Sequence, residues 1–389
     1  MPPAKETGQV SNIPVVKVHL KTITGSDTVR FNGTYFLDTE EARYEFGSSN
    51  DKVFITLVKD GYKVYNDNRL FLFRQNDKIA FVPANSSGKF IINNNKYQGE
   101  LRLKTADSLL YLINDIDLES YLKGVVPAEI FTNNDTLVEA VKAQAICARS
   151  YSIKKMNVNK DKSFHMYSDV RDQVYKGASI RNVLGDFAVD ETRGNVLVYG
   201  KDIAEIYFHA SCGGILEAPE NVWSSPSKKY LTSAQDVIGK QFADIESPYF
   251  RWTQQRTPGQ LDSLYNYAFG ISHLTDIVQD TMNIPFVLDV SERYNSGRIK
   301  KMSIRYGVDR RELNGYEIRR FFGWPPGTLL PSTLVKFSSH DSLLSIEGAG
   351  NGHGVGLCQY GAMYKAQKGL QYYHILQSYF PGTTLKKLY

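Results

Sequence analysis

The chain has 389 residues, which is enough to bury a substantial core, and its length predicts two or three domains. Hydrophobic residues make up 42% and charged residues 22% of the sequence, and these near-average values exclude a fibrous or largely disordered chain. The net charge is +5, but the 46 Lys and Arg residues are scattered among 41 Asp and Glu residues. Because they form no runs, the charge does not indicate a nucleic-acid partner.

No run of apolar residues approaches the roughly 18 that a membrane span needs, so we expect a soluble protein. The start, MPPAKETGQV, lacks the basic and apolar regions of a secretory signal. Two alternatives stay open: a cytoplasmic protein, or one from which a signal has been removed. The three cysteines, Cys147, Cys212 and Cys358, form no CxxC pair, which excludes a scaffold built on disulfides.

The first quarter of the chain predicts strands. After a segment expected to be disordered (1–14), short alternating apolar runs extend from residue 15 to residue 113: VVKVHL, KVFITLV, KIAFV, KFIIN, ELRL and SLLYLI. Turn-forming pairs such as Asn32-Gly33 and Asp60-Gly61 separate them. This pattern is typical of a β-rich region.

The period changes after residue 114. Asp117 is a candidate N-cap for a short helix over 118–123 that we expect to stop at Gly124. Proline disrupts a helix interior, so Pro127 predicts that Glu129 lies at a turn or at the opening of a helix.

The next helix is the clearest in the sequence. Thr136 and Glu139 have the spacing of a capping box ahead of a helix over 139–155. The residues that share one of its faces, and that we assign to the core, are Leu137, Val141, Ala145 and Ala148.

The remaining sequence mixes strands and helices. A hairpin is expected from 195–200 and 204–209, followed by a helix over 274–282, strands over 285–290 and 299–307, and helices over 359–369 and 372–380. The glycine-rich loop 348–356, GAGNGHGVG, indicates backbone that passes very close to another segment or to an extended ligand.

These elements predict an α+β fold. Its parts are a β-rich region (15–113), the first part of a catalytic core (114–237), an inserted α/β elaboration (238–345) and the C-terminal part of the core (346–389).

Glu129 is the first candidate for chemistry. Its neighbours Val125, Val126, Ile130 and Phe131 are apolar, and no basic residue is closer in sequence than Lys123. Desolvation without a cationic partner raises the pKa of a carboxyl group, as a general acid near neutral pH requires. The alternative is a glutamate at a helix opening that faces water and is stabilised by the helix dipole.

Other polar residues suggest ligand binding. Asp172, Gln173 and Tyr175 suit sugar recognition through hydrogen bonds and ring stacking, although an ordinary surface loop explains them as well. His353, inside the glycine-rich loop, either binds substrate or is a structural histidine. The loop lacks the GxxxxGK[ST] and βαβ patterns, so we exclude a nucleotide site.

The cysteines leave alternatives open. Four residues with the types of a zinc site are His209, Cys212, His353 and Cys358, but their spacings match no known zinc pattern, and we expect no obligatory metal. A Cys212–Cys358 disulfide and buried thiols are the other possibilities. Cys147 lies mid-helix beside the apolar face, which argues against a nucleophile, and no G-x-S-x-G elbow is present.

Several motifs together carry a family resemblance. From residue 15 to the C-terminus the chain resembles the sporulation stage II protein D (SpoIID/LytB) family, on the basis of INDIDLESYLKGVVPAEI, EAVKAQAICARSYSI, DQVYKG, YFHASCGG, YLTSAQD, GHGVGLCQYGA and ILQSYFPGTTL.

The resemblance implies a lytic transglycosylase of peptidoglycan that acts on glycan strands stripped of stem peptides, with Glu129 as the catalytic glutamate. It also implies a glycan groove lined by Gln144, Arg149, Ser150, Tyr151, Asp172, Gln173, Tyr175, Ser211, Cys212, Gly213, His353 and Gln359.

A single acid suffices for this chemistry. Glu129 would protonate the glycosidic oxygen and then, as a base, assist attack by the muramic 6-hydroxyl group. If water attacked instead, Asp172 would be the candidate partner and the enzyme a hydrolase.

The rival hypothesis is a non-catalytic activator of an N-acetylmuramoyl-L-alanine amidase, because some relatives are described as amidase enhancers. Under both hypotheses the expected partner is the glycan strands of peptidoglycan. The rival hypothesis adds an amidase. We expect no cofactor, no nucleic acid, and a place outside the cytoplasm near a membrane, in the periplasm or cell wall.

Overall fold

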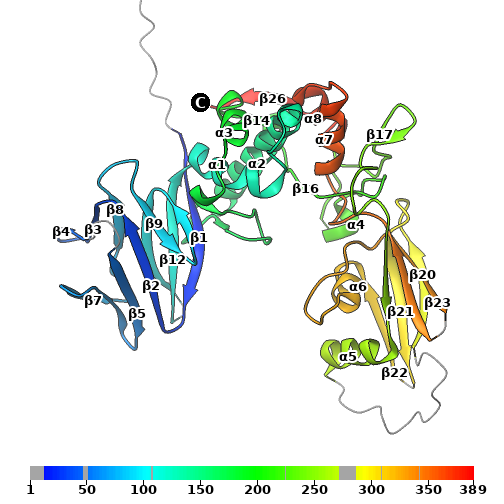
Figure 1. The fold of residues 1–389 in the computed structure, drawn as a ribbon, viewed down its shortest axis with the longest axis horizontal. Helices are drawn as coiled ribbons and strands as arrows, with labels where there is room; N and C mark the ends of the chain where they lie inside the picture. Colours follow the sequence, from blue (N-terminus) through cyan, green and yellow to red (C-terminus); the bar gives the residue numbers. More distant parts are fainter. Residues whose placement is uncertain are drawn as a thin grey trace, which may run out of the picture. The chain divides into compact units, whose positions relative to one another are not determined.

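The computed structural model describes residues 13–46, 51–106, 108–223, 225–270, 286–307, 309–340 and 342–389. The fold is mixed α+β, as predicted (Figure 1). It divides into two compact units: unit 1 is Met1–Ile206 with Thr384–Tyr389, and unit 2 is Tyr207–Thr383. The subdivision predicted at residues 114, 238 and 346 stays a prediction. The helix predicted over 274–282 and nearly all of the segment predicted to be disordered lie outside the described residues.

The β-rich N-terminal region is confirmed. One sheet of unit 1 contains, in spatial order, β13 (Met166–Tyr167), β1 (Val15–Ile23), β12 (Leu109–Asp117), β11 (Glu100–Ala106), β8 (Ile79–Pro83), β3 (Tyr35–Asp38) and β4 (Arg43–Glu45). The other contains β10 (Asn95–Tyr97), β9 (Lys89–Ile92), β2 (Ser26–Asn32), β5 (Lys52–Val58), β6 (Gly61–Tyr65) and β7 (Leu70–Arg74).

Aromatic side chains join the two sheets. The ring of Phe31 on β2 lies 4.6 Å from that of Tyr35 on β3 and 4.9 Å from that of Phe81 on β8. All three side chains are fully buried. Alternate residues of each strand therefore point into a shared apolar layer, as the period of two in the sequence predicts.

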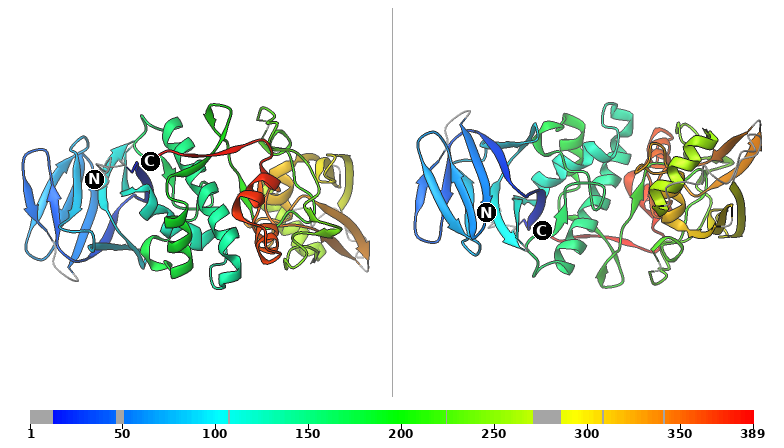
Figure 2. Two further views of the ribbon diagram at one scale, coloured as in Figure 1. Left: turned by 90° about the horizontal axis from the view of Figure 1, so that it is seen from above. Right: turned by 90° about the horizontal axis from the view of Figure 1, so that it is seen from below.

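Helices and short strands complete unit 1. They are α1 (Leu118–Glu129), η1 (Asp135–Leu137), α2 (Val138–Val158), η2 (Gly177–Ser179), α3 (Val183–Glu191), β14 (Asn195–Tyr199), β15 (Asp202–Ile203) and β26 (Thr384–Lys387). The C-terminal strand β26 pairs antiparallel with β14, and Figure 2 shows this red strand running back beside the helices of the middle of the chain.

The start of α1 is as predicted, but its end is not. The side chain of Asp117 accepts the amide hydrogen of Ser120, which confirms the N-cap. The prediction that the helix stops at Gly124 is wrong, because α1 continues through Pro127 to Glu129. The Ile130 amide still donates to the carbonyl of Val126, 3.1 Å away. The proline removes one backbone donor, at a cost of about 3 kcal/mol, and burial of Leu122, Val125 and Val126 offsets this cost.

Gly124 has a different role from the predicted helix stop. A Cβ atom at this position would lie 2.7 Å from the carbonyl oxygen of Gly177 and 2.7 Å from the ring of Tyr175. The carbonyl of Gly124 also accepts the amide hydrogen of Lys176. The glycine therefore lets the 175–177 segment pack directly on the backbone of α1.

The capping box predicted for Thr136 and Glu139 is wrong. Asn134 caps the 3-10 turn η1 instead, and its Oδ1 accepts from both the amide and the hydroxyl group of Thr136. Glu139 is in the first turn of α2, paired with Lys142. The residues predicted to form the core face of α2 are buried, which confirms that part of the prediction: Leu137, Val141, Ala145 and Ala148.

The hairpin predicted from 195–200 and 204–209 is only partly correct. β14 and β15 form it, but its second strand ends at Ile203. Residues Phe208 and His209 form β16 in unit 2 and pair in parallel with Leu357 and Cys358 of β25. Of residues 204–209, only Phe208 and His209 form a strand, and that strand lies in a different sheet from the hairpin.

Unit 2 combines small sheets with helices. Its elements are β16 (Phe208–His209), α4 (Glu220–Trp223), β17 (Val237–Ile238), β18 (Gln241–Phe242), β19 (Trp252–Arg256), α5 (Pro258–Phe269), β20 (Phe286–Arg293), β21 (Ile299–Tyr306), β22 (Asp309–Asn314), α6 (Gly315–Phe322), β23 (Val335–His340), β24 (Leu343–Gly348), β25 (Leu357–Cys358), α7 (Gln359–Gln367) and α8 (Tyr372–Tyr379). The strands predicted over 285–290 and 299–307 and the two C-terminal helices are confirmed.

The sheets β20-β21-β22 and β19-β24-β23 share one apolar core with α5 and α6. Tyr265 of α5 is central to it, with ring contacts to Phe286 and Tyr306 at 5.6 and 5.0 Å. Within the described part of the chain, no helix has the length and apolar character that crossing a membrane requires.

Candidate active site and a cysteine–histidine cluster

Glu129 is the last residue of α1, so the prediction that it opens a helix or lies in a turn is wrong. Its side chain is half-buried, and Oε1 accepts the backbone amide hydrogen of Val174 at 2.8 Å. The neighbours Val125, Val126 and Ile130 are buried, whereas the ring of Phe131 is 54% exposed. The amide of Val174 therefore helps to orient the carboxyl group at the border between an apolar interior and the surface.

The segment Asp172–Tyr175 holds this arrangement together. The carboxylate of Asp172 is nearly buried and lies 2.6 Å from Nζ of Lys155 on α2. Its Oδ1 also accepts the hydroxyl hydrogen of Tyr151 at 2.7 Å, and its Oδ2 accepts the amide hydrogen of Tyr167 at 2.8 Å. Oδ1 thus ties Asp172 to α2, and Oδ2 ties it to β13.

The next residues of the segment are also anchored. Gln173 is fully buried, and its Oε1 accepts from the hydroxyl groups of Tyr121 and Ser152 at 3.2 and 3.0 Å. The hydroxyl group of Tyr175 donates to Oδ1 of Asn114 at 2.9 Å, and its buried ring lies 4.7 Å from that of Tyr121. The amide of Val174, between them, is therefore presented to Glu129 by a rigid backbone.

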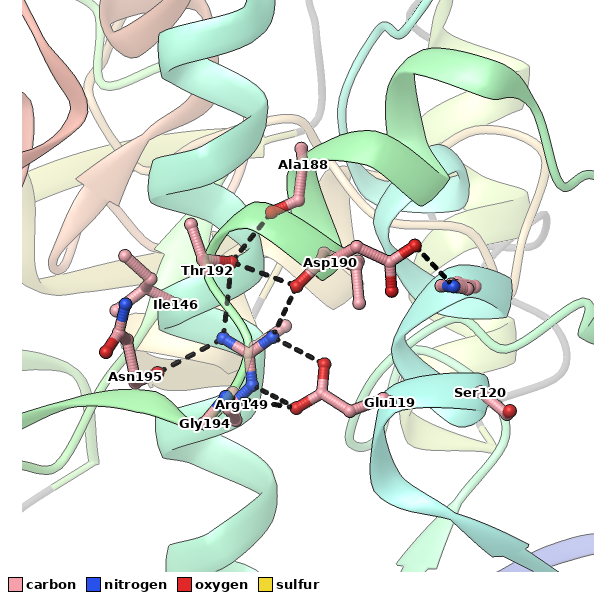
Figure 3. A network of polar contacts seen from close by, with 12 residues as sticks. Glu119, Ser120, Ile146, Arg149, Ala188, Asp190, Thr192, Gly194 and Asn195 are labelled. Carbon is pink, nitrogen blue, oxygen red and sulfur yellow. Dashed lines mark hydrogen bonds and ion pairs between the residues drawn. The ribbon is translucent and has the colours of Figure 1, made fainter. Parts of the chain in front are cut away.

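Arg149 and Glu119 form a buried ion pair between α2 and α1 (Figure 3). Two contacts of 2.8 Å join Nε and Nη2 of Arg149 to the two oxygens of Glu119. The remaining donors of the guanidinium group reach the carbonyls of Val189 and Asn195 and the hydroxyl group of Thr192. All the hydrogen-bonding capacity of Arg149 is therefore used inside unit 1.

Two other residues of α2 that the sequence placed near glycan are also fully buried. The hydroxyl group of Ser150 donates to the carbonyl of Ile146 and accepts from the amide of Leu197. The side-chain amide of Gln144 has no hydrogen-bond partner within the described residues. For Gln144, Arg149 and Ser150, contact with glycan stays a prediction, and the hydrogen bonds of Arg149 and Ser150 stabilise unit 1.

Cys147, also on α2, is fully buried. Burial raises the pKa of its thiol well above the ordinary value. A thiol in this environment stays protonated, so Cys147 is not suited to act as a nucleophile.

In unit 2, the turn Ser211–Gly213 is fixed by a buried carboxylate. Oδ2 of Asp244 accepts from the hydroxyl group of Ser211 at 2.6 Å and from the amide of Gly213 at 2.7 Å. Ser211 and Asn351 also exchange two backbone hydrogen bonds. These hydrogen bonds attach the turn to the glycine-rich loop.

Residues next to this pairing place two sulfur atoms and one imidazole nitrogen atom close together. His209, Cys212 and Cys358 are buried, and one ligand atom of each lies within 4.8 Å of the others. His353, the fourth residue of the sequence-derived zinc hypothesis, is not in this cluster. Its Nδ1 accepts the amide hydrogen of Val355, and its ring packs 5.3 Å from that of His209 and 4.8 Å from that of Trp223.

The glycine-rich loop owes its composition to these contacts. A Cβ atom on Gly352, whose φ is +112°, would lie 2.7 Å from Cβ of His209. The loop therefore passes very close to another segment, one of the two possibilities that its sequence raised. Burial, followed by the positive charges of Arg319 and Arg298, lowers the pKa of His353 to about 3. Its ring is therefore neutral at neutral pH. Gln359 is buried at the start of α7.

Three residues that position the candidate sites were missed in the sequence. Lys155 lies one helical turn beyond Tyr151 and is visible as an i, i+4 neighbour on the same face of α2. Asp244 and Arg298 are far from the SCGG turn in sequence, and no local pattern connects them to it. Only the fold brings them there.

Unit 1 is an α+β domain in which Glu129 ends a capped helix and the DQVY segment packs against that helix. The comparison with protein families identifies the same part of the chain. Residues 106–199 match the family described as Stage II sporulation protein (SpoIID). The chain belongs to the SpoIID family. Residues 234–356 match a second family, a domain of unknown function designated DUF8618.

Individual relatives agree with this assignment. An uncharacterized protein of Brachyspira hyodysenteriae is 27% identical over 379 residues, covering 96% of this chain and 94% of that protein. The amidase enhancer of Bacillus subtilis is 30% identical over 298 residues, which cover 68% of this chain and 40% of that protein. Stage II sporulation protein D of Bacillus subtilis is 27% identical over 291 residues, 71% of this chain and 76% of the relative.

Proposed function

We propose that this protein cleaves the glycan strands of peptidoglycan between N-acetylmuramic acid and N-acetylglucosamine, as a lytic transglycosylase that acts outside the cytoplasm. Its preferred substrate is glycan from which an amidase has removed the stem peptides. Glu129 acts first as the general acid and then as the general base.

The observation that carries this proposal is the position of the Glu129 carboxyl group. It lies at the C-terminal end of α1, where the partial negative charge of the helix dipole disfavours an added negative charge. Buried Val125 and Val126 flank it, and the amide of Val174 fixes its orientation. A half-buried, oriented carboxyl group is suited to donate a proton to a leaving oxygen and to take one back.

Exposed apolar side chains near Glu129 support a sugar-binding surface. Phe131 is 54% exposed two residues after Glu129. The side chain of Asn182, at the N-cap of α3, donates to the hydroxyl group of Thr132, so the start of α3 lies beside this segment. Phe187, on α3, is 46% exposed. Aromatic faces of this kind suit the apolar faces of sugar rings.

The contacts of Asp172 favour the transglycosylase over a hydrolase. A hydrolase that inverts configuration needs a second carboxylate as the base for water. Asp172 is occupied by Lys155, by the hydroxyl group of Tyr151 and by the amide of Tyr167. Because these contacts already engage Asp172, we assign both proton transfers to Glu129 alone, and the muramic 6-hydroxyl group replaces water as the nucleophile.

The names of the relatives are consistent with a cell-wall function. One is an amidase enhancer and another a stage II sporulation protein. A protein that cuts peptide-stripped glycan would act after an amidase, which accounts for both an enhancing effect and a distinct chemical step.

The test is Glu129→Gln on amidase-treated sacculi. Glutamine keeps an oxygen to accept the Val174 amide but cannot transfer a proton, so the fold is expected to remain and release of soluble glycan fragments to fall by at least about 100-fold. Glu191→Gln, at the exposed end of α3, is the matched control and should keep full activity. Undiminished activity of Glu129→Gln would refute the catalytic role.

The rival is a non-catalytic activator of an N-acetylmuramoyl-L-alanine amidase, favoured by the name of the Bacillus subtilis relative. Purified protein and peptide-free glycan, with no amidase present, separate the two. Release of fragments with 1,6-anhydro ends supports the enzyme. No release from this glycan, together with faster cleavage of intact peptidoglycan by an amidase when the protein is added, supports the activator.

A further inference from the structure

We propose that His209, Cys212 and Cys358 bind a zinc ion inside unit 2. This departs from the sequence-based expectation of no obligatory metal. It goes beyond the proposed glycan chemistry, to which these residues contribute no step.

The three ligand atoms are already close together. They lie within 4.8 Å of one another. A tetrahedral zinc ion with Zn–S distances of about 2.3 Å separates its ligand atoms by about 3.7 Å. Side-chain shifts of about 1 Å or less therefore complete the coordination.

The imidazole group of His209 is oriented as in a metal ligand. Its Nδ1 lies 3.1 Å from the carbonyl oxygen of Val355, to which a protonated Nδ1 donates. This tautomer leaves the lone pair on Nε2, which is buried and has no hydrogen-bond partner among the described residues. A buried, unpartnered nitrogen is costly, and a metal ion satisfies it.

The backbone fixes the geometry of all three ligands. His209 and Cys358 are register partners in the parallel pair β16–β25. Cys212 follows in the turn held by Asp244, and its amide donates to Sγ of Cys358 at 3.3 Å. A donor of this kind stabilises a thiolate, which is the form that binds zinc.

The charges around the cluster are compatible with two thiolates and a divalent cation. Arg298 is buried, and its Nη2 donates to the carbonyl oxygen of Cys212 at 2.9 Å. Asp236 has an oxygen 3.7 Å from Sγ of Cys212, but Lys365 and the hydroxyl group of Tyr379 hold this carboxylate at 2.6 and 2.8 Å. Asp236 is therefore a supporting group.

Zinc fits these donors better than other common ions. Two sulfur atoms and one imidazole nitrogen exclude magnesium and calcium, which prefer oxygen. A disulfide between Cys212 and Cys358 would use the sulfur atoms but leave Nε2 of His209 unsatisfied.

The sequence positions of the two cysteines also fit a structural zinc site. Cys212 and Cys358 are 146 residues apart and bracket the whole segment 234–356 that matches the second family. A zinc ion would fasten the two ends of this segment to each other within unit 2.

The experiment is metal analysis of the full-length protein purified under reducing conditions without chelators. We expect about one zinc per chain in the wild type. The Cys212→Ser and Cys358→Ser variants should lose at least about 90% of it. Cys147→Ser, which alters the third cysteine in unit 1, is the matched control and should keep the metal.

Cobalt substitution keeps the test decisive if a serine variant fails to fold. Exchange of the bound metal for Co²⁺ in the wild type should give the intense thiolate-to-cobalt absorption and the visible bands of a tetrahedral site. A wild-type protein without metal that also shows no such absorption on addition of Co²⁺ would overturn the proposal. A Cys212–Cys358 disulfide, detected as a mass loss of two hydrogens per chain in the freshly purified protein, would overturn it as well.

Discussion

The carboxylate of Glu119 and the guanidinium group of Arg149 meet edge to edge in the interior of unit 1, with two N–O contacts of 2.8 Å. They join α1, which ends at Glu129, to α2. The hydroxyl group of Tyr389 and the amide of Gly194 donate to the same carboxylate. The ion pair therefore connects the helix that carries the candidate catalytic residue to the last residue of the chain.

The first prediction concerns this pair. Arg149→Met leaves a buried carboxylate without a cation and should lower the free energy of unfolding by about 3–5 kcal/mol. Arg43→Met, which breaks the exposed pair with Asp38, should lower the free energy of unfolding far less. Urea unfolding followed by circular dichroism measures both.

A second variant separates charge from packing. Glu119→Gln combined with Arg149→Met removes both charges and should recover at least about 1 kcal/mol relative to Arg149→Met alone. No recovery would mean that the guanidinium group acts through its volume and not through its charge.

The sequence predicted the strands of the β-rich region well, because alternation of apolar residues directly reports which face of a sheet is buried. It failed at α1, where Gly124 and Pro127 are local signals for a helix end. Burial of Val125 and Val126 outweighs those signals, and no local pattern reports tertiary burial.

The candidate site was predictable only in part. Glu129, Tyr151 and Asp172 were identified from motifs, and the last two are hydrogen-bonded to each other. The sequence named His209, Cys212 and Cys358 as residues of zinc-binding type, together with His353. It could not show that the first three cluster without His353, because the cluster depends on parallel pairing of β16 with β25 across nearly 150 residues. The short spacings within each pair carry no information about that register.

Gly124 gives the second prediction. Gly124→Ala places a methyl group 2.7 Å from the Gly177 carbonyl oxygen and should lower the free energy of unfolding by about 1–3 kcal/mol. Gly25→Ala is the control, since a Cβ atom there meets nothing within 4 Å, and it should change the stability by less than about 0.5 kcal/mol. Equal effects in thermal unfolding would contradict the close contact between α1 and the 175–177 segment.

The third prediction is a pH dependence of stability. Burial, followed by the charges of Lys17 and Arg102, lowers the pKa of His165 from 6.5 to about 4. Between these values the unfolded chain binds a proton that the folded chain does not. The contribution of His165 to the stability is therefore fully present above pH 6.5 and is lost as the pH decreases towards 4.

His165→Asn is the variant that tests this pH dependence. Asparagine keeps an acceptor for the amide of Lys17, which donates to Nδ1 of His165 at 3.1 Å, but it does not titrate. The variant should lose less stability than the wild type between pH 6.5 and 4, and His374→Asn, on an exposed part of α8, should behave as the wild type.

The titration of Asp115 changes the stability in the opposite direction to that of His165. The test must therefore compare the pH profile of the His165→Asn variant with that of the wild type. Burial raises its pKa to about 6, and its folded form therefore binds a proton more readily than its unfolded form. Identical pH profiles for the wild type and His165→Asn would show that His165 does not titrate as we expect.

The last prediction distinguishes the two fates of the cleaved sugar. Asp172→Asn should lower the rate of glycan release by about 10-fold, because it weakens the contacts to Lys155 and Tyr151 that hold the segment presenting the Val174 amide to Glu129. The chemical identity of the product should not change. If Asp172 only positions this segment, every released fragment still ends in a 1,6-anhydro sugar, since the 6-hydroxyl group remains the nucleophile. If Asp172 were the base for water, the wild type would release reducing ends, and the variant would lose them selectively. Mass spectrometry separates the two products by the 18 Da of one water molecule. Asp190→Asn is the control for loss of a surface ion pair, because Asp190 on α3 is the exposed partner of Lys123.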